Sequence, residues 1–242
     1  KQSQPLAVKS ICRSYKVALK KLNEENKMSN IQAVELIVNN IQNLEEAKKL
    51  LEGEISEKLC TAVDKKVSNF IESLDEKWEG KFNFYDEYAV EFSPENWRAK
   101  NGDNFKFQHY CAYYYLWCKS QATDVEGTEW WFTTFLKNNV DQMAFYFILG
   151  KDNFLKCNQR DLKKFTDEMN IKYTEIENLG FKYNAKAGSW YLVIDGIDPQ
   201  LFIENYENDN LEDALEPFEV ALKKLKQAHP YFDAIVQAAK EK

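Results

Sequence analysis

The chain has 242 residues and a formal net charge of −7, and it is 44% hydrophobic and 29% charged. These proportions are ordinary for a globular protein, while eight glycines and five prolines are too few for a collagen-like or low-complexity chain. No apolar run approaches the roughly 20 residues that a membrane-spanning helix requires, so we expect no membrane partner.

The negative charge is not evenly distributed. Residues 1–80 hold 13 basic and 13 acidic side chains, whereas residues 81–242 hold 19 and 26, so the whole net charge lies in the second part. A nucleic-acid surface usually shows clustered positive charge, and no such cluster is visible in the sequence. Charge therefore does not support a nucleic-acid partner, and a protein partner or a second copy of the chain is the expectation.

The sequence contains five cysteines and two histidines, His109 and His229. No two cysteines have the C-x-x-C spacing of a zinc or redox site, and two histidines are few for a metal site built from His and Cys. We therefore expect no cofactor, no metal, and free thiols in a reducing cytoplasm. Because the chain begins with Lys1 instead of methionine, we expect it to be a fragment of a longer protein.

Residues 1–80 show the apolar spacing of helices and predict an N-terminal helical bundle. Ser29 and Asn43 fit the start of helices as capping residues, and Gly53 separates the last two segments. The expected helices cover residues 11–22, 29–41, 43–51 and 55–74.

At Gly80 the chain changes, and residues 81–242 predict an aromatic-rich α+β domain with a largely antiparallel sheet flanked by helices. Only three of the 35 aromatic residues precede this boundary. About five strands are expected, at 82–92, 105–117, 144–149, 181–183 and 190–194. Helices are expected at 131–136, 158–169, 199–206 and 211–228, the last bent at Pro217, and Pro230 is expected to open a further short helix.

Carboxylates are the first candidates for chemistry. A two-metal nuclease needs an Asp and a Glu-x-Lys on neighbouring strands, where the carboxylates hold Mg²⁺. Glu79-Gly80-Lys81 has this spacing, but no Asp-bearing strand precedes it. Glu79, Asp86 and Glu91 are the carboxylates on which such an activity would depend, and we interpret them as solvated or helix-terminal charges.

His109 and Cys111 are two residues apart on an expected strand and so would lie on one face. Catalysis by Cys and His usually draws the two residues from separate elements. We therefore interpret both side chains as structural and assign no catalytic or metal-binding residue.

The most unusual segment is Tyr110–Trp117. Strand alternation places Tyr113, Tyr115 and Trp117 on one face and Tyr114 on the other. Exposed aromatic rings can serve as platforms for bases or sugars, but we favour a strand that is buried on both faces.

Two tryptophans complete the candidate set for ligand or partner binding. In the pair Trp130-Trp131 we expect one ring to pack and the other to be exposed. The candidate residues are Tyr113, Tyr115, Trp117, Trp130 and Trp97.

The order of segments resembles the accessory C-terminal region of bacterial PD-(D/E)XK nuclease-superfamily proteins. The resemblance rests on Ile11-Cys12-Arg13-Ser14-Tyr15 with Leu19 and Leu22, on Met28-Ser29, and on Phe92-Ser93-Pro94-Glu95-Asn96-Trp97. It implies a part of a defence or restriction-type protein whose catalytic core is not in this chain, because the catalytic Asp and Glu-x-Lys of that superfamily have no matching positions here.

These observations predict a non-catalytic recognition or assembly module of a cytoplasmic bacterial protein, within a nuclease-type defence system if the resemblance holds. The composition break at Gly80 and the acidic aromatic domain motivate this hypothesis, since protein interfaces favour Tyr, Trp and Phe. The alternative is a Mg²⁺-dependent nuclease or other hydrolase with a degenerate carboxylate site. A third hypothesis is the stacking of sugars or bases on the tyrosine strand.

Overall fold

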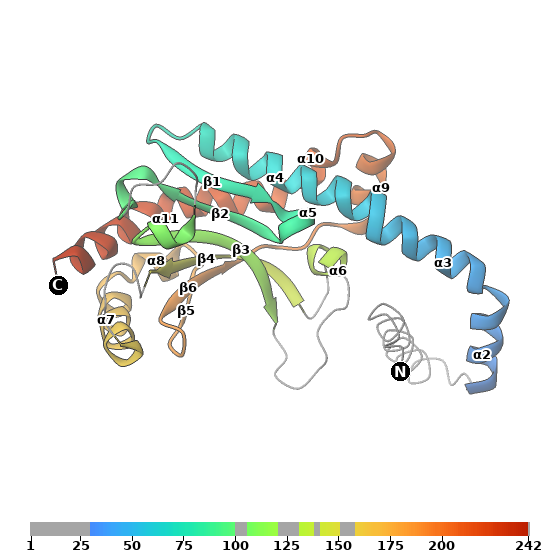
Figure 1. Cartoon of the computed structure of the whole chain (residues 1–242), viewed down its shortest axis with the longest axis horizontal. Coiled ribbons are helices and arrows are strands. Elements are labelled where there is room, and N and C mark those ends of the chain that lie inside the picture. Colours follow the sequence, from blue (N-terminus) through green and yellow to red (C-terminus); the bar gives the residue numbers. More distant parts are fainter. Residues whose placement is uncertain (1–29, 100–105, 121–130, 138–140, 151–157, 242) are drawn as a thin grey trace, which may run out of the picture.

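The structure is a computed structural model, and it describes residues 30–99, 106–120, 131–137, 141–150 and 158–241 (Figure 1). Residues 1–29 of the expected helical bundle, including the helix over 11–22, lie outside the described residues. The other part of that region is helical up to Glu72.

A six-stranded antiparallel sheet forms the centre of the fold, in the order β1-β2-β3-β4-β6-β5. The expectation of an α+β fold with a largely antiparallel sheet is confirmed, with six strands in place of about five. The strands are β1 (Trp78–Asn83), β2 (Ala89–Pro94), β3 (Ala112–Ser120), β4 (Asp141–Leu149), β5 (Lys182–Asn184) and β6 (Ser189–Val193).

Helices precede, interrupt and follow the strands. Before the sheet come α2 (Asn30–Asn39), α3 (Ile41–Leu50), the π-helical segment η1 (Leu51–Ile55) and α4 (Ser56–Glu72). Between strands lie α5 (Phe84–Glu87), the 3₁₀ turns η2 (Glu95–Trp97) and η3 (Phe107–His109), α6 (Trp131–Phe135), α7 (Gln159–Lys172) and α8 (Glu175–Asn178). The chain closes with α9 (Pro199–Glu207), α10 (Leu211–Ala214) and α11 (Glu216–Lys240).

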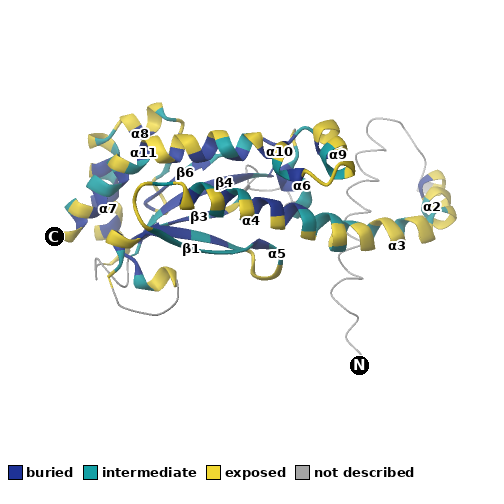
Figure 2. Cartoon of the chain, turned by 90° about the horizontal axis from the view of Figure 1, so that it is seen from above, coloured by how far each residue is buried: buried dark blue, intermediate teal, exposed yellow. Residues whose placement is uncertain are grey.

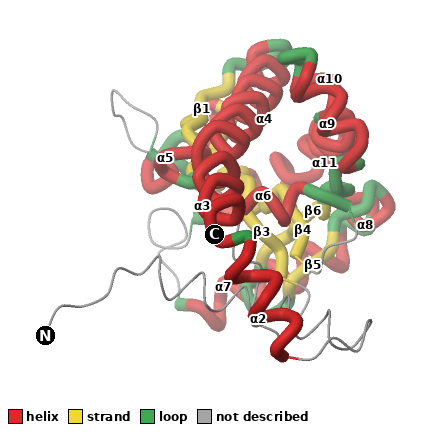
Figure 3. Tube along the Cα trace, turned by 90° about the vertical axis from the view of Figure 1, so that its right-hand side faces the viewer, coloured by secondary structure: helices red, strands yellow, loops and turns green. Residues whose placement is uncertain are grey.

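The two longest helices, α4 and α11, lie side by side over one face of the sheet (Figures 1 and 2). Seen along its length, the molecule shows these helices as a layer above the strands (Figure 3). Val63 and Val67 of α4 and Phe218 of α11 are fully buried in the same hydrophobic core as the strands. Gly80, where the composition changes, lies inside β1, so the first strand begins before that position.

The sheet face beneath α11 is lined by large aromatic rings. Tyr114, Phe147 and Trp190 are cross-strand neighbours on β3, β4 and β6 and are almost completely buried. Phe232 of α11 packs on all three, with ring centroids 5.9, 4.2 and 6.0 Å away. Burial of such rings contributes roughly 1.5–3 kcal/mol each relative to exposure, so this row and α11 stabilise each other.

Two expected strands are corrected by the structure. The strand predicted over 82–92 is a hairpin of β1 and β2, interrupted by α5 and by Tyr88 in the left-handed conformation. Both carboxylate oxygens of Asp64 on α4 accept from the Phe84 N–H, at 3.2 and 3.1 Å, and hold the start of α5. The strand predicted over 105–117 begins only at Ala112, after the turn η3.

The helix predicted to end near Ala228 continues to Lys240, and Pro230 lies inside α11 instead of opening a new helix. Proline removes one backbone donor and usually kinks or breaks a helix. Here Ala228 and Phe232, on either side of the proline, are both fully buried. Packing of both halves against the sheet therefore overrides the local preference.

Gly188 makes the turn between β5 and β6, with φ of +68°. A Cβ atom at this position would lie 2.8 Å from Oγ1 of Thr166 on α7. We expect Gly188→Ala to lower the free energy of unfolding by about 1–2 kcal/mol, because the left-handed conformation and the contact both disfavour a side chain. Urea denaturation measures this loss of stability, and Ala187→Ser, at the exposed neighbouring position, is the control. Equal stability of the two variants would contradict this reading of the turn.

Candidate functional site

The sheet face turned away from α11 carries a row of side chains that crosses all six strands. The row consists of Lys81, Glu91, Tyr115, Tyr146, Tyr191 and Lys182. Its three central residues, the tyrosine row, are stacked on one another. The ring centroids of Tyr115 and Tyr146 are 4.9 Å apart, and those of Tyr146 and Tyr191 are 5.7 Å apart.

The alternation predicted for the tyrosine strand is confirmed. Tyr114 and Leu116 are buried, while Tyr113 and Tyr115 are half-buried and Trp117 is 40% exposed. The favoured interpretation, a strand buried on both faces, is wrong for the second face. One face of β3 belongs to the core, and the other presents three aromatic side chains in a line.

A pocket of about 300 Å³ lies at the β2 side of this line, and we call it the aromatic pocket. Its lining residues are Tyr88, Val90, Glu91, Tyr113, Tyr115, Leu116 and Trp117. The pocket follows from the pairing of the strands. Nine residue pairs join β3 to β4, but only two join β2 to β3, at Glu91–Tyr115 and Phe92–Tyr114. Beyond Tyr115, β3 continues without β2 beside it.

The aromatic side chains that line the aromatic pocket are packed against rings of neighbouring segments. Tyr88, 49% exposed, follows α5 and stacks on Trp131 of α6 at 5.5 Å. Trp131 in turn meets Trp117 edge-on at 5.0 Å. Tyr113 contacts both Tyr115 and Phe107, at 6.0 and 5.2 Å. Rings held by several neighbours keep their positions, which favours a preformed binding site.

Among the residues that the structure describes, Glu91 is the only acidic side chain that lines the aromatic pocket. Burial raises the pKa of this carboxyl above its ordinary value, and the nearby positive charge of Lys81 acts against that shift. Lys81 itself forms an ion pair with Glu87. The pocket therefore combines aromatic walls with one partly desolvated negative charge.

Of the other residues predicted to bind, Trp97 lies in the core. Its ring is fully buried, and its indole Nε1 donates to Oδ1 of Asp233 on α11 at 2.7 Å. Trp97 therefore takes no part in the surface formed by Tyr113, Tyr115 and Trp117. Trp130 lies outside the described residues.

His229 occupies a buried position between Trp97 and Trp78, with ring centroids 5.0 and 4.6 Å away. Its Nδ1 is 3.0 Å from the hydroxyl of Tyr114. Burial raises the pKa of Tyr114 well above 10, so this hydroxyl keeps its proton, and the tautomer of the neutral imidazole decides which of the two groups donates. Burial lowers the pKa of His229 to about 4, although the Asp233 carboxylate acts in the opposite direction.

The carboxylates named for a hydrolase have different surroundings. Glu79 accepts from Arg98 and from the hydroxyl of Tyr110, and this hydrogen bond from Tyr110 is the main reason its pKa is lowered. Asp86 is an exposed residue of α5, and Glu91 lines the aromatic pocket. Within the described ranges, no three His, Cys, Asp or Glu side chains are grouped so that they could hold a metal ion.

His109 and Cys111 do not lie on one strand, contrary to the prediction from the sequence. His109 ends the turn η3 and Cys111 is buried just before β3, so the two do not alternate on one strand. Burial raises the pKa of the Cys111 thiol, which disfavours the reactive thiolate.

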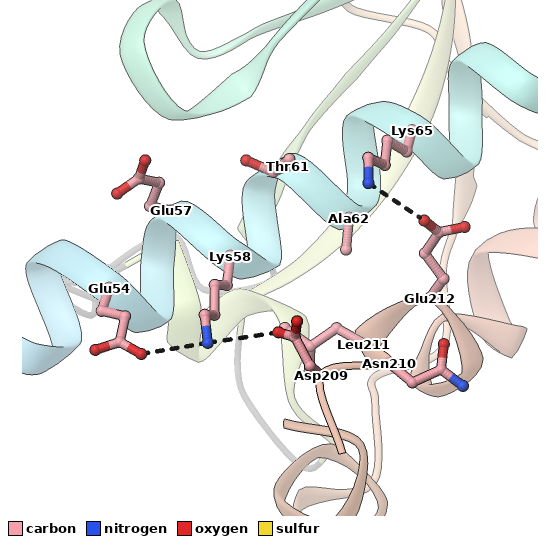
Figure 4. Close-up of a pocket in the computed structure, with 10 residues that line it drawn as sticks. All are labelled: Glu54, Glu57, Lys58, Thr61, Ala62, Lys65, Asp209, Asn210, Leu211 and Glu212. Carbon is pink, nitrogen blue, oxygen red and sulfur yellow. Dashed lines mark ion pairs between the residues drawn. The ribbon is translucent and has the colours of Figure 1, made fainter. Parts of the chain in front are cut away.

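A second pocket, of about 380 Å³, lies between α4 and the segment that joins α9 to α10 (Figure 4). Lys58 extends across it to Glu54 and Asp209, with N–O distances of 3.3 and 3.5 Å, and Lys65 reaches Glu212 at 3.9 Å. These pairs bring two helical segments together. Ligand pockets are usually apolar with few polar groups, so we take the aromatic pocket as the candidate site.

Sequence reasoning found three of the pocket's aromatic residues and missed Tyr88. Tyr88 lies in the segment that was predicted as one strand, so its left-handed conformation, and hence its place at the pocket, was not predicted. Tyr146 and Tyr191 lay in segments correctly predicted as strands, and the alternation of those strands could have placed them on the same face as Tyr115.

None of the helices in the described part of the chain combines the length and the hydrophobicity needed to cross a membrane. Comparisons with protein-family models, with curated proteins and with solved structures give no match to this chain.

Proposed function

We propose that the chain is a recognition module that binds a ligand at the aromatic pocket. The observation that carries this proposal is the half-exposed line of Tyr113, Tyr115 and Trp117 beside a pocket on a rigid sheet. Aromatic side chains supply a large contact area with few rotatable bonds, which is why they dominate recognition surfaces. A position on a central strand adds rigidity that a loop does not give.

The proposal is tested by titrating the full chain with three probes of different chemistry: adenosine, cellobiose and choline chloride. The readout is the proton–nitrogen NMR signal of the Trp117 indole, assigned by its disappearance in Trp117→Phe. We expect at least one probe to shift this signal. The buried Trp97 indole, whose donor is bonded to Asp233, is expected to stay within a small fraction of that shift and provides an internal control.

A folded protein whose Trp117 signal moves with none of the three probes would count against ligand binding at this pocket. The sequence-level prediction of a protein partner or a second copy is a separate matter and stays a prediction. Size-exclusion chromatography with light scattering addresses it, because a strict monomer contradicts a homo-oligomer.

The membership of a nuclease-type defence system stays a prediction as well. It would be supported by a nuclease core encoded directly upstream of Lys1. The alternative of a Mg²⁺-dependent hydrolase has its own test, which is cleavage of DNA or RNA that is lost on chelation. Glu79, which is bound to Arg98 and Tyr110, gives that alternative no support.

A further inference from the structure

In the described part of the chain, four aromatic side chains and one carboxylate line the aromatic pocket. Tyr113, Tyr115 and Trp117 come from β3, Tyr88 comes from the turn before β2, and Glu91 comes from β2. The faces of aromatic rings carry partial negative charge. Ring faces that remain free on the pocket side therefore add negative potential to that of the carboxylate.

We propose that the aromatic pocket binds a small organic cation with a methylated ammonium group, of the quaternary ammonium type. Aromatic rings attract such cations by about 0.5–1 kcal/mol at exposed sites and by about 2 kcal/mol where water is removed. This inference rests on the proposed function and specifies its ligand class.

The arrangement of the rings argues against the other two ligand classes. Tyr115 and Tyr146 stack on each other at 4.9 Å, which occupies ring faces that a planar base or a sugar would need. The half-buried carboxylate of Glu91 repels phosphate groups, which disfavours nucleotides. A methylated ammonium is more compact than a base or a sugar, so one ring face left free on the pocket side is enough for it, and it needs no dedicated hydrogen-bond acceptor.

The charges around Glu91 are consistent with a cationic ligand. Lys81 on β1 and Glu87 on α5 are the charged groups that act on its carboxyl, and they form an ion pair with each other. They therefore contribute little net charge, and the negative charge of Glu91 is left for the pocket. Among the described residues, Glu91 takes part in none of the ion pairs, which contrasts with Glu79 and Glu87.

The test is isothermal titration calorimetry of the full chain at constant ionic strength with four probes. Tetramethylammonium and choline carry the methylated cation. Ethanolamine replaces it with an unmethylated, strongly hydrated ammonium. The neutral isostere of choline, with a tert-butyl group in place of trimethylammonium, keeps the shape without the charge. We expect choline to bind at least about tenfold more tightly than the neutral isostere and than ethanolamine.

Variants locate the binding within the pocket. Glu91→Gln and Trp117→Leu are each expected to weaken choline binding by about 5- to 30-fold, the range that corresponds to one lost charge or ring contact. The matched control is Tyr191→Phe, on the same sheet face but outside the pocket, which is expected to bind choline like the original chain. The far-ultraviolet circular dichroism of each variant checks that it is folded.

Three results would overturn the inference: no binding of either methylated cation, equal binding of the neutral isostere, or unchanged binding in both Glu91→Gln and Trp117→Leu. Such a result would leave the proposed function, ligand binding at the aromatic pocket, to be decided by the other probes. If adenosine or cellobiose shifts the Trp117 signal while choline does not, the pocket recognises a ligand and the cationic class is wrong. If no probe shifts it, both fail.

Discussion

Replacing Phe232 by alanine is expected to lower the free energy of unfolding by about 3–5 kcal/mol, the range measured for large-to-small changes of buried aromatic residues. Phe232 is fully buried on α11 and contacts the rings of Phe147, Tyr114 and Phe181. Its removal leaves a cavity at the place where α11 meets the centre of the sheet. Urea denaturation followed by circular dichroism measures the loss.

The matched control for this change is Val220→Ala on the same helix. Val220 is 43% exposed, so its truncation is expected to change the free energy of unfolding by less than about 0.5 kcal/mol. If Phe232→Ala were no more destabilising than Val220→Ala, α11 would not be packed on the sheet as the structure shows.

Stability is expected to fall on acidification because of His229. Its pKa is about 4 in the folded protein and 6.5 in the unfolded chain, so between these values the unfolded chain binds more protons. The contribution is fully present above pH 6.5 and is lost as the pH falls toward 4. At pH 4.5 the loss relative to pH 7.5 is about 2–3 kcal/mol.

The groups that face His229 explain why burial decides its charge. The Tyr114 hydroxyl is hydrogen-bonded to Nδ1, and the Asp233 carboxylate favours the charged ring. Glu76 lies 3.7 Å from Nε2, but its side chain is 60% exposed, so solvent screens its charge. The ring is 12% exposed and packed between two indoles, which disfavours the protonated form.

Asp64 is expected to oppose the effect of His229, because its own contribution to stability increases on acidification over part of the same pH range. Burial raises the pKa of its carboxyl from 3.8 to about 6, so the folded protein binds this proton more readily. Acidification from pH 6 toward 3.8 therefore increases the contribution of Asp64 to stability. The net pH dependence of the chain is the difference between the two groups and the remaining carboxylates.

Two variants separate these contributions in urea titrations between about pH 4.5 and pH 7.5. In His229→Gln, the free energy of unfolding is expected to fall less on acidification than in the original chain, whatever the absolute stability of the variant. In Asp64→Asn, the free energy of unfolding is expected to fall more on acidification than in the original chain. If the pH dependence of stability were unchanged in His229→Gln, the pKa of His229 would be the same in the folded and the unfolded protein, and burial would not lower it.

Local sequence patterns predicted the sheet and the composition of its faces. The alternation of Tyr113, Tyr114 and Tyr115 was readable because side chains on a strand point to opposite faces with a period of two. The cap at Asn158, whose Oδ1 accepts from the Asp161 N–H at 3.0 Å, and the start of α9 at Pro199 were also readable. Each of these depends on a few neighbouring residues.

The errors came from features that depend on residues far apart in the chain. Pro230 stays within α11 because both sides of the helix pack into the core, and α5 divides the first hairpin because Asp64, 20 residues earlier, binds the Phe84 N–H. The side of β3 that is exposed could not be read from β3, because burial of Tyr114 depends on α11 and Trp97.

The sequence by itself determined that the chain is α+β, that its aromatic residues are concentrated after Gly80, and that Tyr113, Tyr115 and Trp117 share one face. Only the tertiary structure decided that this face is half-exposed and that Glu91 and Tyr88 join it to form a pocket. The reason is that β2 and β3 pair over just two residues and then part. The pairing of β2 with β3 joins residues more than 20 positions apart, and no periodicity within either strand specifies where that pairing stops.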